Sequence, residues 1–118
     1  MTKEESKKAA IAARLRAARE MAGLSQGQVA KMLGLHRPSI SEAEAGRRKV
    51  SAEELATFAN IYKVSLSWLA CADPEDIANP EMARYELAAR KLSKMKKEDF
   101  DQLMKLLAAY RNEEESNS

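Results

Sequence analysis

A chain of 118 residues, 45% hydrophobic and 32% charged with a net charge of +2, is long enough for one globular domain and a short appendage. It has no run of about eighteen apolar residues, which excludes a membrane span, and its charged N-terminus does not resemble a secretory signal. One cysteine and one histidine exclude an intramolecular disulfide and a zinc site, so we expect a reduced, cytoplasmic protein without metal or cofactor.

The charge is unevenly distributed along the chain. Residues 1–72 hold 12 Lys and Arg against 7 Asp and Glu, a net charge of +5. Residues 73–118 hold 8 against 11, a net charge of −3, and the two values sum to the overall +2. A basic first part indicates contact with nucleic acid, and an acidic second part indicates contact with protein. We therefore predict a domain boundary at Ala72.

Five helices are predicted in the basic part. Strong helix formers fill residues 3–22, and Gly23 marks the end of that helix. Capping-box motifs at Ser25 and Ser51 open the second and the fourth helix. No strand-like alternation appears, so we expect an all-α fold. In chain order, the predicted helices cover residues 3–22, 26–33 and 37–45, followed by one after Ser51 and one after Ser65.

The acidic part is predicted to form a helical extension. Asp-Pro and Asn-Pro dipeptides at residues 73–74 and 79–80 each place a proline directly after a cap residue, at the first position of a helix. Residues 80–112 carry too many large apolar side chains for a free tail. A break within residues 94–99 would divide this segment, and the sequence leaves one helix or two open. The acidic end, residues 112–118, is expected to fray.

The stretch LGLHRPSISEAEAGRRK, residues 33–49, allows three interpretations: a flexible loop, a metal-binding corner, or a helix end that meets phosphate. A loop is excluded because Ile40 and Glu44 fall on a helical period that Gly46 ends. A metal site is excluded because His36 has no partner at a ligand spacing. Two short helices joined by a glycine-containing turn have the length of a helix-turn-helix.

The segment LSQGQVAKMLGLHRPSISEAEAGRRKVSAEELATFANIYKVSLSWL, which begins at Leu24, resembles the phage repressor and Cro-like (XRE) helix-turn-helix family. The resemblance covers about residues 9–70. It implies a five-helix, phage-repressor-like DNA-binding domain of a transcriptional regulator, a repressor, whose partner is double-stranded DNA. The features that carry it are LSQ, the Val29-Ala30 pair, Gly34, Ile40, Glu44, Gly46, the cationic run and VSLSWL.

In this family the third helix enters the major groove with its N-terminal residues toward the base edges. Arg37 is the strongest base reader, because a guanidinium can bind guanine O6 and N7 bidentately. Glu42 suits a cytosine amino group. Pro38 stands where the family often has a polar reader and offers only apolar contact, for example with a thymine methyl. The predicted base contacts are Arg37, Pro38, Ser39, Ser41 and Glu42.

Phosphate contacts are predicted at the start of the second helix and after the third. The free N–H groups and the positive end of a helix suit an anion. His36 falls at the N-cap of the third helix, where the family prefers Ser or Thr, and whether its ring contacts DNA or only caps the helix stays open. The predicted phosphate contacts are Ser25, Gln26, His36, Arg47, Arg48 and Lys49.

Arg19 lies within the apolar stripe of the first helix, where an unpaired guanidinium would cost several kcal/mol. The family has an Arg–Glu pair at the positions of Arg19 and Glu44. We therefore interpret both residues as a structural ion pair that ties the first helix to the third, and not as DNA contacts.

The extension is predicted to form a homodimer, because one small module reads few base pairs and useful affinity needs two half-sites. Two alternatives stay open. The extension can fold back on its own domain, or the protein can be an antitoxin-like interaction protein that binds a protein partner and autoregulates its operon. An enzyme is excluded, since no phosphate-cradling glycine loop or nucleophile–base set is present. The predicted dimer interface contains Met82, Tyr85, Leu92, Met95, Phe100, Leu103, Met104, Leu107 and Tyr110.

Overall fold

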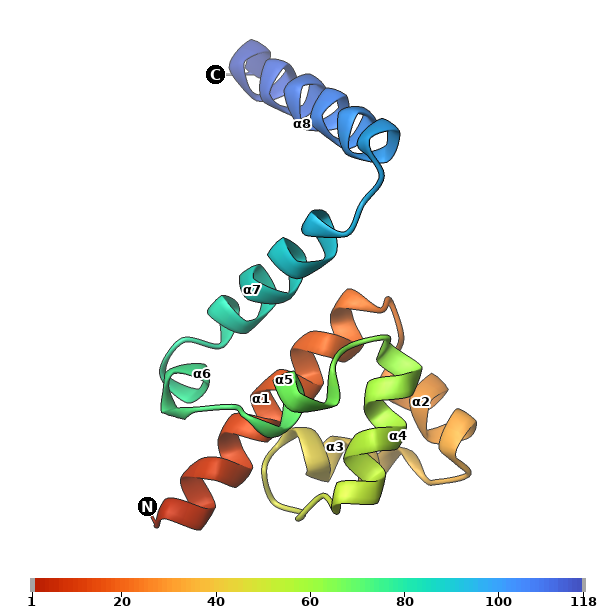
Figure 1. The fold of residues 1–118 in the computed structure, drawn as a ribbon, viewed down its shortest axis with the longest axis vertical. Helices are drawn as coiled ribbons and strands as arrows, with labels where there is room; N and C mark the ends of the chain where they lie inside the picture. The colour runs from red at the N-terminus through yellow and green to blue at the C-terminus, as the bar shows by residue number, and fades with distance from the viewer. Residues whose placement is uncertain (1, 118) are drawn as a thin grey trace. The chain divides into compact units, whose positions relative to one another are not determined.

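A computed structural model of the chain describes the backbone of residues 2–117 and the side chains of residues 2–111. Every regular element in that range is an α-helix (Figure 1), which confirms the predicted all-α fold. The helices are α1 (Lys3–Met21), α2 (Gln26–Leu33), α3 (Arg37–Glu44), α4 (Ala52–Tyr62), α5 (Leu66–Ala70), α6 (Pro74–Ala78), α7 (Pro80–Ser93) and α8 (Lys97–Asn117).

Two capping boxes fix where α2 and α4 begin. The backbone N–H of Gln28 donates to the Ser25 hydroxyl at 3.1 Å, and the N–H of Ser25 donates to the Gln28 side chain at 2.8 Å. Ser51 and Glu54 make the same exchange at 3.1 Å in both directions. Each box satisfies two N–H groups that a helix start leaves without intrahelical partners. Both boxes are those predicted from the sequence.

Two glycines set the turns around α3. Gly34 ends α2 in the left-handed region, at φ +68°, a conformation that costs glycine nothing. Gly46 follows α3 at φ +75°, and a Cβ at that position would lie 3.3 Å from the Cα of Ala9. The turn after α3 therefore lies directly against α1, and a side chain at Gly46 would be crowded by α1 and strained by the positive φ.

The core of the first compact unit, Met1–Leu87, forms around α1, which packs against α3, α4, α5 and α6. The rings of Phe58 and Tyr62 stack with their centroids 5.8 Å apart. Burying such side chains is the main favourable term in folding, at roughly 1.5–3 kcal/mol for each large group. The largest fully buried side chains are Tyr62, Phe58, Leu15, Ile40, Leu69 and Val29.

This unit extends beyond the predicted boundary at Ala72. The Nε of Arg14, on α1, donates to a carboxylate oxygen of Asp76, on α6, at 3.1 Å, and both residues are buried. Ala83 and Leu87, on α7, are part of the same core. The unit therefore ends at Leu87, because an ion pair and two core residues join the later segment to α1.

The second unit, Ala88–Ser118, contains the end of α7 and all of α8. The helices are separate, since α7 ends at Ser93 and α8 begins at Lys97, and the break falls where the sequence suggested one. The end predicted to fray falls on residues 112–118, whose side chains lie outside the described residues. The backbone of α8 continues through Asn117.

Candidate nucleic-acid interface

The helix α3 has one face in the core and one face in solvent. Ile40 and Ala43 are fully buried. Arg37 and Pro38, at its first turn, are exposed, and the other three predicted base readers, Ser39, Ser41 and Glu42, are half-buried. The structure thus brings all five residues onto one short helix whose first turn presents a guanidinium to solvent.

His36 occupies the N-cap of α3 with an extended backbone, at φ −88° and ψ 149°, but its side chain makes no capping hydrogen bond. The residue is exposed. The sequence left two roles open for this ring, a DNA contact or capping of the helix. The structure shows no capping by the ring.

Glu44, at the last turn of α3, joins three helices. Its Oε2 accepts from Arg19 Nε at 2.6 Å and its Oε1 from Arg19 Nη2 at 3.0 Å, so the pair is bidentate. The same Oε1 accepts from Gln26 Nε2 at 3.2 Å, at the start of α2. Arg19 also donates from Nη1 to the carbonyl of Leu24 at 2.8 Å. These contacts fix the position of α3 relative to α1 and α2.

The Arg19–Glu44 pair is well shielded, with side-chain exposures of 12% and 5%. The hydrogen bond to Glu44 raises the pKa of Arg19 further, so the guanidinium stays charged. Burial raises the pKa of the neighbouring Tyr62 above its ordinary value of 10.0, and the charge of Glu44 adds to the effect. Within the described residues the Tyr62 hydroxyl has no hydrogen-bond partner.

The side chains of two predicted phosphate contacts have partners inside the protein. The Gln26 amide donates to Glu44, and the Ser25 hydroxyl caps α2. What this helix start still offers to a phosphate is its positive end and its backbone N–H groups.

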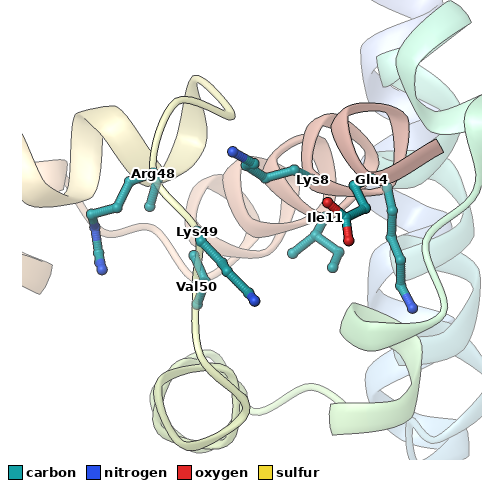
Figure 2. A pocket seen from close by; sticks show the side chains of 8 residues that line it. Glu4, Lys8, Ile11, Arg48, Lys49 and Val50 are labelled. Atoms are coloured by element: carbon teal, nitrogen blue, oxygen red, sulfur yellow. The ribbon is translucent and has the colours of Figure 1, made fainter. Parts of the chain in front are cut away.

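The three cations after α3 are not equivalent. Arg47 is 71% exposed and lies 3.5 Å from Glu42, and Lys49 is exposed. Arg48 is half-buried: its Nη1 pairs with Glu54 at 2.9 Å. Figure 2 shows the Arg48 side chain directed away from that of Lys49.

The Arg48–Glu54 contact joins the turn after α3 to the capping box of α4. A hydrogen bond from the backbone of Ser51 lowers the pKa of Glu54, and Arg48 lowers it further, so the carboxylate is charged at neutral pH. Arg48 also donates from Nε to the carbonyl of Ser39 at 3.4 Å. No sequence pattern indicated this contact, because both residues of the pair are ordinary surface residue types.

Arg14 is a further residue to which the sequence assigned no role. Its guanidinium lies 4.8 Å from the centre of the Trp68 ring, donates to the Trp68 carbonyl, and lies 3.7 Å from Glu86. Its partner Asp76 lies 62 residues further along the chain, so no local sequence pattern indicated the pair.

A helix-turn-helix family model matches residues 15–69. The match begins within α1, contains α2, α3 and α4, and ends within α5. Searches of curated proteins and of solved structures returned no match.

Among the residues that the structure describes, no helix combines the length and the hydropathy needed to cross a membrane. No group of three or more His, Cys, Asp or Glu side chains there could hold a metal ion.

Three observations identify the module: the buried and exposed faces of α3, the glycine turn before it, and the family match. The chain carries, in residues 15–69, a DNA-binding helix-turn-helix domain of the phage repressor and Cro-like (XRE) family of transcription regulators.

Proposed function

We propose that this regulator is a repressor that binds a pseudo-palindromic operator as a homodimer, with α3 of each copy in the major groove. The observation that carries the proposal is the orientation of α3. Its inner face is buried and held by Glu44, so its exposed first turn is available to base edges.

Arg37 is the principal base reader in this proposal. It is exposed at the first position of α3, where a guanidinium can donate to O6 and N7 of one guanine. Pro38 packs on a thymine methyl, and Ser39 and Ser41 donate or accept at neighbouring bases. Glu42 can accept from a cytosine amino group once it releases Arg47, which lies 3.5 Å from it.

The phosphate contacts flank α3 on both sides. Arg47 and Lys49 bind the backbone after α3, because their charges are exposed. The start of α2, at Ser25 and Gln26, binds a phosphate through its positive end and through the backbone N–H groups that the capping box does not use. His36, which does not cap α3, adds a contact at the other end of the helix. Arg48 contributes less, since Glu54 already neutralises it.

The homodimer forms through α7 and α8. In α8, Phe100, Leu103, Leu107 and Tyr110 recur at steps of three and four residues and define one apolar stripe. Of these four, three are exposed and Leu103 is half-buried. Monomers avoid apolar patches of this kind. A second copy is the occupant that also supplies the second α3 that a two-fold operator requires.

The experiment is a footprint of the full chain on the DNA upstream of its own gene. The expected result is one protected region with two symmetric half-sites whose centres lie about 10 base pairs, or one turn, apart. Protection of a single asymmetric site would contradict the homodimer, and no protection would contradict binding at this operator. A second protein that co-purifies in stoichiometric amount would instead favour a protein partner for α8.

A further inference from the structure

A groove of about 360 Å³ lies beside the DNA-binding helix, between the first turns of α1 and the segment that follows α3 (Figure 2). Its apolar floor consists of Ile11 from α1, Ala43 from α3 and Val50, just before α4. None of the five predicted base contacts lines this groove, whereas Arg48 and Lys49, two of the predicted phosphate contacts, do.

The rim of the groove is basic. Lys7 and Lys8 line it from α1, and Lys49 lines it from the segment after α3. Within the described residues, no ion pair engages the ammonium group of any of these three lysines. Arg48 also borders the groove, but its guanidinium is paired with Glu54. The available charge is therefore that of three lysines and one opposing carboxylate, Glu4.

The two walls of the groove are fixed to each other. The backbone of Gly46 approaches α1 so closely that an added Cβ would lie 3.3 Å from the Cα of Ala9. Lys8 is adjacent in sequence to Ala9, and Lys49 lies one short turn after Gly46. The backbone segments that carry Lys8 and Lys49 therefore lie close to each other beside α3.

We propose that this groove is an additional DNA-backbone site, which holds a phosphate outside the base pairs that α3 contacts. Lys7, Lys8 and Lys49 surround the phosphate, and the apolar floor packs against the adjoining deoxyribose. The proposal rests on the proposed function, since it extends the same DNA interface along the duplex.

Glu4 gives the site a distinctive property. A carboxylate at the rim repels the phosphate, so it lowers the affinity that the three lysines provide. Removing its charge should tighten DNA binding, which a merely structural groove would not do. Glu5 is a matched control, because it is exposed in the same first turn of α1 and does not line the groove.

The experiment measures binding of the full chain to a random-sequence 30-base-pair duplex over a series of salt concentrations. The double variant Lys7→Ala, Lys8→Ala should lower the slope of log K against log [salt] by about one unit, the contribution of one phosphate contact. Arg16→Ala, an exposed cation on α1 outside the groove, is the matched control and should change the slope by less than about half a unit. Glu4→Gln should raise affinity about threefold at low salt, and Glu5→Gln should raise it less.

An unchanged slope in the double variant, or equal effects of Glu4→Gln and Glu5→Gln, would overturn the groove proposal. Arg37→Ala separates this failure from failure of the proposed function. If Arg37→Ala still relaxes the base preference at one position of each half-site while the double lysine variant binds like the wild type, the groove proposal is wrong and the proposed function stands. If the wild-type chain binds no duplex at any salt concentration, both are wrong.

Discussion

Arg19 and Glu44 share two hydrogen bonds, at 2.6 and 3.0 Å, across the contact between α1 and α3. Replacing Arg19 by Met leaves the Glu44 carboxylate buried without its cation, so we expect a loss of about 3–5 kcal/mol in the free energy of unfolding. The double variant Arg19→Met, Glu44→Leu should recover most of it, because apolar replacement of a buried pair is often neutral. Chemical denaturation measures both. A cost under about 1 kcal/mol for the single change would show that the pair behaves as a surface contact.

Base recognition depends on Arg37. Arg37→Ala should weaken binding to the selected operator by about 1–3 kcal/mol and relax the preference at one position of each half-site, while binding to random DNA changes little. Arg47→Ala, the matched control, removes the same charge from the turn after α3 and should weaken both duplexes alike. Titration of each variant against both duplexes distinguishes a loss on the operator alone from an equal loss on both. An equal loss on both for Arg37→Ala would make Arg37 a phosphate contact.

The cations after α3 should separate into two kinds. Lys49→Ala and Arg47→Ala should each reduce the salt slope of DNA binding by up to about one unit, because both charges are exposed. Arg48→Ala should leave the slope nearly unchanged and lower stability by at most about 1 kcal/mol, because it breaks the contact with Glu54. Salt titrations and thermal unfolding of the three variants provide the comparison. A larger change of slope for Arg48→Ala than for Lys49→Ala would refute this division.

Tyr62 should make stability sensitive to alkaline pH. Burial raises its pKa above the ordinary value of 10.0, so the folded state keeps the phenol proton that the unfolded chain releases. Stability is therefore fully present below pH 10.0 and falls as the pH rises further. Tyr62→Phe should remove this loss of stability at high pH. At pH 7 the substitution should change the free energy of unfolding little, because the hydroxyl has no partner among the described residues. Urea denaturation at pH 8 and pH 11 tests this; parallel losses in the two proteins would disprove it.

The apolar stripe of α8 should hold the dimer together. Phe100→Glu combined with Leu107→Glu places charges on that stripe and should convert the full chain to a monomer in sedimentation experiments. Lys105→Glu changes the net charge by the same amount, lies off the stripe, and should remain dimeric. A double variant that stays dimeric would locate the interface elsewhere. A cut after Ala72 is not a clean test, because it removes Asp76 from the buried Arg14 and Leu87 from the core.

Local signals made most of the fold predictable. The capping boxes at Ser25 and Ser51, the glycines at the ends of α1, α2 and α3, and the steps of three and four between apolar residues mark helices over short distances. The Arg19–Glu44 pair was predictable because a cation in an apolar stripe demands a partner and the family resemblance supplied one. The five predicted base readers do lie together on α3.

Contacts between segments far apart in the chain were not predictable. Arg14 and Asp76 are ordinary charged residues in the sequence, and they form a pair only because α6 packs against α1. The predicted boundary at Ala72 therefore came too early, since the first unit continues to Leu87. The contact of the Gln26 side chain with Glu44 and that of Arg48 with Glu54 were not predictable either, because both depend on the angles between helices. The groove beside Lys8 and Lys49 likewise exists only where the turn at Gly46 meets α1.

Selection from a pool of random duplexes with the full chain tests most directly whether α3 recognises a two-fold DNA site. We predict enrichment of a symmetric motif with half-site centres about 10 base pairs apart. With the Arg37→Ala variant, the base preference at one position of each half-site should be lost. A pool that shows no enriched motif, or a motif without symmetry that Arg37→Ala leaves unchanged, would contradict the role assigned to α3.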